Sequence, residues 1–79
     1  MDQPIGERLR RAREKKSLSL DTISQELFIR VHYLEALEAG DFDALPSQAQ
    51  ARGFLRIYAE YLELDPDETL ENAAGKQAL

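Results

Sequence analysis

Few side chains in this sequence could carry acid–base or ligand chemistry. The 79 residues include one histidine, His32, and no cysteine, and they contain no glycine-rich phosphate loop. Glu35 and Glu38 fall on one side of a predicted helix, but carboxylates paired on a helix surface are commonly solvated rather than catalytic. A lone imidazole also lacks the partners that a metal site or an acid–base pair needs. We therefore expect no enzyme activity, no catalytic or metal-binding residue and no cofactor.

Charge is divided unevenly along the chain. Residues 1–16 carry six Lys or Arg against three Asp or Glu, whereas residues 17–79 carry four basic and twelve acidic side chains, for a net charge of −5. The basic segment could contact nucleic-acid phosphates, anionic lipid or an acidic protein surface, or it could simply be solvated. A composition of 43% hydrophobic and 32% charged residues is typical of an ordered domain.

The elements that must position these residues are predicted to be helices. Apolar residues recur at spacings of three and four, and no stretch alternates with a period of two. Five helices are expected, over residues 5–16, 20–27, 31–39, 48–62 and a short one that begins at 65–68. The tight connection between the second and third is typical of a helix-turn-helix. The predicted fold class is an all-α five-helix bundle containing a helix-turn-helix, with one domain over residues 1–75 and a frayed tail over 76–79.

Short-range signals set several of these boundaries. Ser19 is a suitable N-cap for the second helix, and Gly40 is a natural residue to follow the end of the third. The segment Asp41–Pro46 lacks helical spacing and ends at a proline, which predicts a loop. Phe42 and Leu45 are expected to hold this loop against the core.

Two residues depart from the usual pattern of such a fold. Phe28 stands in the turn between the second and third helices, where repressor-type turns often have glycine, and we expect it to pack inward. Gly53 lies inside the fourth helix, where glycine costs up to about 1 kcal/mol relative to alanine. Because such a glycine usually permits the close approach of another backbone, we expect the first or the fifth helix to pack closely there, with a partner protein as the less favoured alternative.

Two stretches of the chain carry a family resemblance: YLEALEAGDFDALP at residues 33–46 and ARGFLRIYA at residues 51–59. Weaker support comes from IGERLRRARE at residues 5–14, which is shared by many Xre regulators. With these motifs the chain resembles, over about residues 5–70, the helix-turn-helix domain of the RodZ family. That domain is itself a variant of the Xre and lambda-repressor fold.

The resemblance implies a location and a partner. In the RodZ family this domain is the cytoplasmic part of a single-pass inner-membrane protein, and it binds the actin-like filament protein MreB and couples it to the wall-building machinery. A membrane span would then lie beyond Leu79, and contact with the membrane would come only through it. The favoured function is therefore that of a protein-interaction adaptor domain.

The helix expected over residues 48–62 has two apolar surfaces. Placing its residues at steps of 100° gives an inner face of four apolar residues, Ala51, Leu55, Tyr58 and Leu62. Beside this face lies a second set, which we call the helix-four flank: Gln50, Phe54, Ile57 and Tyr61. The flank is either covered by the fifth helix or exposed to anchor a protein partner.

The resemblance places the filament contact on the helix-four flank. The family contact uses two aromatic side chains one helical turn apart, of which the second matches Phe54. The first aligns with Gln50, a departure from the aromatic pattern that leaves filament binding and the choice of partner open. The predicted partner-binding residues are Phe54, Gln50 and Ile57, with Arg52 and Arg56 on the adjoining polar face placed to pair with acids on the filament.

The alternative function is sequence-specific DNA binding by an Xre-type transcriptional regulator. The third helix would then read the major groove, through Arg30, His32 and Tyr33. The same surface is expected to present four carboxylates, from Glu35, Glu38, Asp41 and Asp43. Because phosphate neutralisation supplies much of the affinity for DNA, nucleic acid is the less favoured partner.

Overall fold

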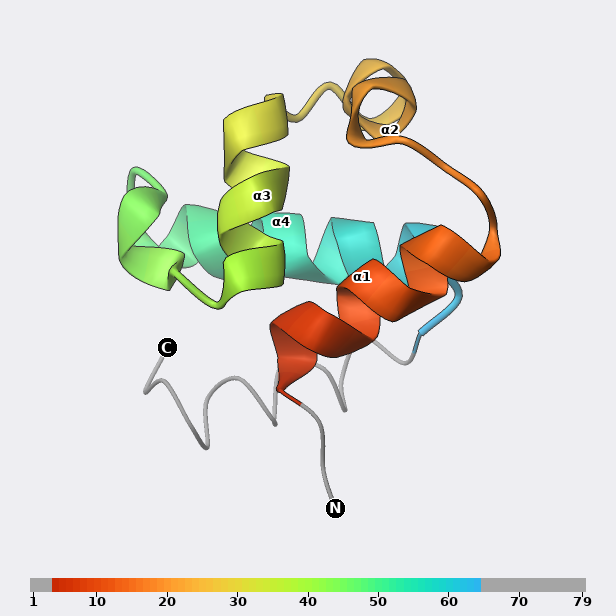
Figure 1. Ribbon diagram of the computed structural model, residues 1–79. Helices are drawn as coiled ribbons and strands as arrows, with labels where there is room; N and C mark the ends of the chain where they lie inside the picture. Colours follow the sequence, from red (N-terminus) through yellow and green to blue (C-terminus); the bar gives the residue numbers. More distant parts are fainter. Residues whose placement is uncertain (1–3, 65–79) are drawn as a thin grey trace.

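A computed structural model describes residues 4–64, and this part of the chain is entirely helical (Figure 1). Its elements are the α-helices α1 (Ile5–Lys15), α2 (Leu20–Leu27), α3 (Val31–Ala39) and α4 (Gln48–Tyr61), with a 3-10 turn, η1 (Phe42–Ala44), before α4. The all-α class and the first four predicted helices are confirmed to within one residue at each end. The described residues thus show four α-helices where a bundle of five was predicted, because the expected fifth helix lies outside them. The predicted domain end at residue 75 and the tail over 76–79 also lie outside.

Local side-chain chemistry explains where the helices begin and end. The Ser19 hydroxyl accepts a hydrogen bond from the backbone N–H of Thr22 at 3.1 Å, which confirms the predicted N-cap of α2. Ser47 caps α4 in the same way, through the N–H of Gln50 at 3.1 Å. Gly40 ends α3 in the left-handed conformation, at φ 74°, where the absence of a Cβ removes the steric penalty.

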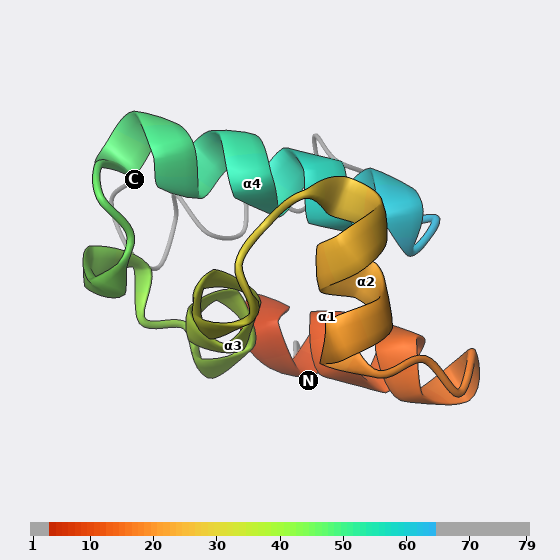
Figure 2. The same ribbon diagram turned by 90° about the horizontal axis from the view of Figure 1, so that it is seen from above.

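Two helices run along opposite edges of the described fold, with the other two between them. Viewed from above, α4 follows one edge and α1 the other, while α2 and α3 occupy the space between (Figure 2). The α2–α3 connection crosses this space in Figure 2 and lies above α4 in Figure 1. One side of α4 therefore meets the core, and the side turned away from α1 lies at the surface.

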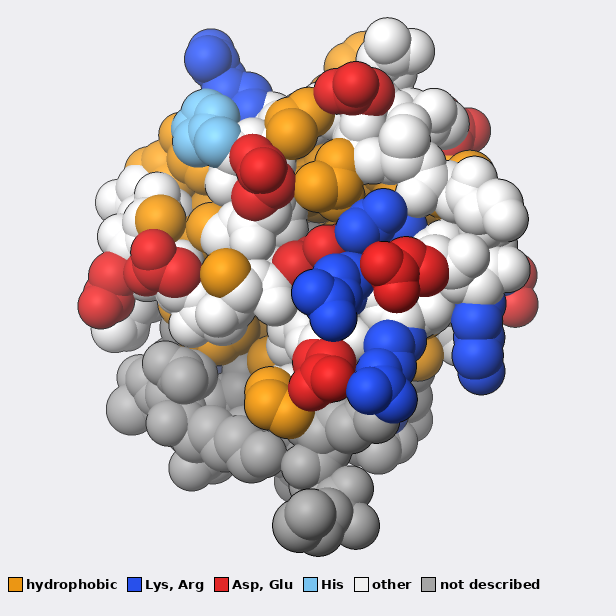
Figure 3. Space-filling model, viewed as in Figure 1, with side chains coloured by type: hydrophobic (Ala, Val, Ile, Leu, Met, Phe, Trp, Pro, Cys, Tyr) orange, Lys and Arg blue, Asp and Glu red, His pale blue; other side chains and the backbone are white. Residues whose placement is uncertain are grey.

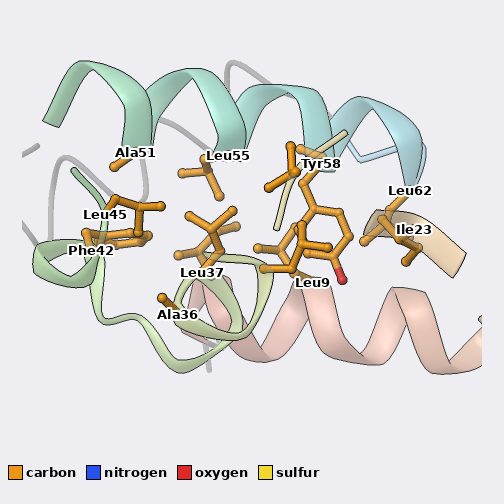
Figure 4. Close-up of a cluster of buried hydrophobic side chains, with 14 residues drawn as sticks. Leu9, Ile23, Ala36, Leu37, Phe42, Leu45, Ala51, Leu55, Tyr58 and Leu62 are labelled. Atoms are coloured by element: carbon orange, nitrogen blue, oxygen red, sulfur yellow. The ribbon is translucent and has the colours of Figure 1, made fainter. Parts of the chain in front are cut away.

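The core is formed by apolar side chains from every helix, and α4 contributes the longest row (Figure 4). The predicted inner face of α4 is confirmed, since its four residues are at most 3% exposed: Ala51, Leu55, Tyr58 and Leu62. Phe42 and Leu45, both 6% exposed, hold the segment around η1 against this core as expected. Burial of this apolar surface is the main favourable contribution to folding.

The close helix approach that glycine permits occurs in α1 rather than at Gly53. A Cβ added at Gly6 would overlap the carbonyl oxygen of Glu38 and lie 2.6 Å from its carbonyl carbon, so α1 and α3 can pack here only without a side chain. At Gly53 no described atom beyond its chain neighbours and the nearby backbone of its own helix lies within 4 Å of where a Cβ would be. The expected approach of α1 to Gly53 is therefore wrong, because this glycine faces outward, and the expected fifth helix lies outside the described residues.

A polar network joins α1, α3 and α4. The Arg13 guanidinium donates from Nε and Nη2 to the two carboxylate oxygens of Glu38, at 2.7 and 3.1 Å, and from Nη1 to the carbonyl of Leu18 at 3.1 Å. Tyr58 donates its hydroxyl proton to the same carboxylate at 2.5 Å. The hydrogen bond to Glu38 raises the pKa of Arg13, and burial together with the bond to Glu38 raises the pKa of Tyr58.

This network corrects the expected surface of α3. The Glu38 side chain is 8% exposed and that of Arg13 is 16% exposed, so neither is a freely solvated charge. Helical spacing predicts that Glu38 lies on the outer surface with Glu35, because the two are three residues apart. Its partner Arg13 is 25 residues away, and helical spacing alone does not reveal such a contact.

Candidate protein-interaction surface

The helix-four flank lies at the surface in the described part of the molecule. Gln50 is exposed, Phe54 is half-buried, Ile57 is 44% exposed and Tyr61 is half-buried. The flank shares α4 with the buried inner face, so it is held in place by the core packing of the same helix. An isoleucine and an aromatic ring one turn apart on a fixed helix are side chains that can anchor a protein contact.

Aromatic packing joins the flank to the start of α3. The rings of Phe54 and Tyr33 lie 5.8 Å apart between centroids, tilted by 33°, and the rings of Tyr33 and His32 lie 4.2 Å apart. Tyr33 is half-buried by these contacts. The structure therefore brings together two predicted sites, because Tyr33 of the DNA-binding alternative packs against Phe54 of the partner-binding set.

At its other end the flank is joined to α2. The Tyr61 hydroxyl donates a hydrogen bond to the Glu26 carboxylate, and this bond is the main cause that raises the pKa of Tyr61. Both side chains lie at the surface, Glu26 in the last turn of α2 and Tyr61 at the end of α4. The last turn of α2 is thereby placed beside the C-terminal part of the flank.

The two predicted arginines of α4 are both exposed. Arg56 donates from Nε to Glu60 at 3.3 Å, an i, i+4 pair in which both side chains are more than half exposed. Such pairs contribute only tenths of a kcal/mol, so Arg56 can exchange Glu60 for an acid on a partner at little cost. Arg52 lies one turn earlier on the same exposed side.

Phe28 does not pack inward, and that prediction is wrong. Its side chain is 94% exposed, and its backbone is left-handed, with φ 58° and ψ 37°. In this conformation the Phe28 N–H still bonds to the Ser24 carbonyl and closes α2, while the following residue, Ile29, enters the core at 2% exposure. A left-handed backbone costs a residue with a Cβ roughly 1 kcal/mol, and the spacing of apolar residues gave no sign of it.

The DNA-binding alternative keeps part of its predicted surface. Arg30 and His32 are exposed at the N-terminal end of α3. Three carboxylates remain exposed on or just after the same helix, from Glu35, Asp41 and Asp43. The count is three rather than the expected four because Glu38 is held by Arg13.

The basic charge of α1 is largely interspersed with acids. Arg11 pairs with Glu7 at 3.0 Å and Lys16 pairs with Glu63 at 3.3 Å, while Arg13 belongs to the buried network. Acidic and basic side chains accordingly alternate over α1 on the face shown in Figure 3. A hollow beside α1 is lined by four basic side chains and three apolar ones: Arg8, Arg11, Ala12, Lys15, Lys16, Leu62 and Leu64. Two of the four cations, Arg11 and Lys16, are paired with acids outside this lining.

Two further features concern residues 4–64 only. They contain no group of three or more His, Cys, Asp or Glu side chains that could hold a metal ion. None of their helices is long and apolar enough to cross a membrane.

Comparison with known proteins defines the class first. Residues 8–69 match a family described as a helix-turn-helix domain, which is most of this chain, and the chain belongs to that family. Within it the chain is of the RodZ type, since 67 of its residues are 48% identical to Cytoskeleton protein RodZ of Streptococcus pneumoniae (strain ATCC BAA-255 / R6). That match covers 85% of this chain and 24% of the relative.

Two more relatives match similar stretches. An uncharacterized membrane protein, YmfM, of Bacillus subtilis (strain 168) is 39% identical over 54 residues, which cover 68% of this chain and 19% of the relative. An uncharacterized protein of Haemophilus influenzae (strain ATCC 51907 / DSM 11121 / KW20 / Rd) is 38% identical over 68 residues, 85% of this chain and 22% of the relative. The chain thus spans less than a quarter of the length of these curated relatives. No solved structure gives a significant match.

Proposed function

We propose that this chain is the protein-interaction module of a RodZ-like cell-shape protein and that it binds an actin-like MreB filament through the helix-four flank. The observation that carries the proposal is the flank itself, where Ile57 is 44% exposed beside a half-buried Phe54. Phe54 packs on Tyr33, which fixes the ring against the domain and reduces the entropy lost on binding. The RodZ and membrane-protein relatives support a place for the module in a membrane-anchored protein. We propose that the module lies on the cytoplasmic side of that membrane.

The flank offers such a partner an apolar centre with polar and charged residues beside it. Phe54 and Ile57 supply apolar surface at the centre, and Gln50 supplies an amide one turn before Phe54. Arg52 and Arg56 stand on the adjoining exposed side, where charge affects the rate of encounter more than final affinity. Because Gln50 replaces an aromatic of the family pattern, we propose that Ile57 carries part of the apolar contact in this chain.

The test is co-sedimentation of the 79-residue chain with MreB filaments from the same organism. The parent is expected in the pellet, and Phe54→Ala or Ile57→Lys is expected to bind about tenfold more weakly or worse, as is usual for a central anchor. Ala39→Lys places the same charge at an exposed helical position outside the flank, so it should pellet like the parent. Failure of the parent to pellet with intact filaments would refute filament binding by this chain.

The folded state of each variant must be measured alongside, because Phe54 contacts Tyr33. Ile57 makes the cleaner probe, since it is the more exposed of the two anchors. Loss of pelleting by a folded Ile57→Lys variant, with Ala39→Lys unaffected, would locate the contact on the flank. Equal pelleting of both variants would show that the contact lies elsewhere on the domain.

The alternative, DNA binding, has one specific observation in its favour: Arg30 and His32 are exposed at the start of α3. It predicts duplex binding that weakens steeply as salt is raised, because counterions are released from phosphates. Arg30→Ala would then reduce the salt dependence. The exposed carboxylates of Glu35, Asp41 and Asp43 oppose this function on the same surface.

A further inference from the structure

The exposed ring of Phe28 is not accounted for by folding. The turn needs a left-handed residue here, because this conformation closes α2 and directs Ile29 into the core. Glycine or asparagine would adopt the same conformation with less strain. A phenylalanine adds both a strained backbone and an apolar ring that is 94% in solvent, and it makes no ring contact with the other aromatic side chains described.

The position of Phe28 connects it to the helix-four flank. Glu26, two residues earlier, holds the Tyr61 hydroxyl at the C-terminal end of the flank. Ile57 lies one helical turn before Tyr61 on the same side of α4. The α2–α3 connection that begins at Phe28 joins the upper ends of these two helices, above α4 in the view of Figure 1. Phe28 and Ile57 are also the two large apolar side chains that stand out as exposed in the described part of the chain.

From this placement we infer that Phe28 is a second anchor for the filament protein. The Phe28 ring inserts into an apolar recess of that partner, while the helix-four flank contacts the adjoining surface of the partner. The inference rests on the proposed function and extends its site from one element to two. It also gives this chain two exposed aromatic or aliphatic anchors although Gln50 occupies the position where the family pattern has an aromatic.

Charge favours an apolar protein surface over a phosphate-bearing one as the occupant. The charges around the two anchors are of both signs: Glu26 accepts a hydrogen bond from Tyr61, Arg30 is exposed two residues after Phe28, and Arg56 is paired with Glu60. An uncharged recess can meet Phe28 and Ile57 without leaving these groups unpaired. A phosphate backbone or an anionic lipid surface would meet the Glu26 carboxylate as well as Arg30, so this surface is not uniformly basic.

The experiment repeats the filament co-sedimentation of the 79-residue chain with three variants and records a thermal unfolding curve for each. Phe28→Asn keeps a residue that tolerates the left-handed turn but removes the ring, and it should bind about tenfold more weakly while melting at or above the parent temperature. Phe28→Tyr keeps an aromatic ring and should bind within about twofold of the parent. Phe54→Ala reports on the flank alone.

The outcomes separate the two proposals. Parent-like binding of Phe28→Asn together with loss of binding by Phe54→Ala would overturn the role of Phe28 and leave the flank as the site. A lower melting temperature for Phe28→Asn would also overturn it, because the ring would then serve folding. A parent chain that does not pellet with intact filaments would overturn the proposed function and this inference together.

Discussion

Two tyrosines on α4 make the same kind of hydrogen bond in opposite surroundings. Tyr58 donates to Glu38 inside the molecule, where its side chain is fully buried, whereas Tyr61 donates to Glu26 at the surface. The inner pair is completed by Arg13, which neutralises the carboxylate. The outer pair has water as an alternative partner for both groups. One side of the helix thus fixes the fold, and the other is left available for binding.

A large expected effect comes from filling the space that lets α1 and α3 pack around the inner network. Gly6→Ala would place a methyl group against the backbone carbonyl of Glu38, which cannot move without separating α1 from α3. We expect a loss of at least about 3 kcal/mol in the free energy of unfolding, the upper part of the range for overpacking. Urea denaturation measures it, and Gly53→Ala is the matched control. A parent-like midpoint for Gly6→Ala would show that the helices can separate at little cost.

The next test removes, one at a time, the carboxylates that accept the two tyrosine hydrogen bonds: Glu38 for Tyr58 and Glu26 for Tyr61. Glu38→Ala leaves the mostly buried Arg13 without its partner and the Tyr58 hydroxyl without its acceptor, so we expect a loss of about 2–3 kcal/mol. Glu26→Ala should leave the urea midpoint nearly unchanged, because its pair with Tyr61 is exposed. Equal losses for the two variants would break the distinction between the inner and outer sides of α4.

Much of the fold could be predicted because its determinants are local. Ser19 and Gly40 act through residues within one turn, and their roles as N-cap and left-handed terminator are confirmed. The inner face of α4 follows from helical spacing alone, and it is buried as predicted. These features require no knowledge of how one helix sits on another.

The features that could not be predicted depend on contacts between distant residues. Glu38 faces inward because Arg13 meets it from another helix, and Gly6 matters because of a backbone on α3. Phe28 is exposed because Ile29 fills the core position next to it. Both residues are large and apolar, so the sequence alone does not predict which of the two is buried. For the candidate site, sequence spacing placed the flank beside the core but did not show the packing of Phe54 on Tyr33.

Alkaline titration should distinguish the two tyrosines by their burial. Burial raises the pKa of Tyr58 above its ordinary value of 10.0, so the folded chain keeps this proton at pH values where the unfolded chain releases it. The resulting stability is fully present below pH 10 and is lost as the pH rises above it, at up to about 1.4 kcal/mol per pH unit. Urea denaturation between pH 9 and 11 measures this slope.

Tyrosine variants provide the controls for that titration. Tyr58→Phe should flatten the dependence above pH 10, because the buried titrating group is gone. Tyr61→Phe should alter it much less, although the bond to Glu26 also raises the pKa of Tyr61, since this ring lies at the surface. A larger flattening from Tyr61→Phe would reverse the assignment of the buried and exposed sides.

The smallest expected effect on stability is the most informative about the flank. Ile57→Lys adds a charge at a position that is 44% exposed, where its long side chain can reach water, so the free energy of unfolding should change by no more than about 0.5 kcal/mol. The same change at the inner face, Leu55→Lys, would bury an unpaired ammonium and should prevent stable folding. If Ile57→Lys instead lowered the urea midpoint strongly, the flank would be part of the folded core. A stable Ile57→Lys variant that no longer binds filaments would show that the inner face of α4 serves folding and that the helix-four flank serves binding.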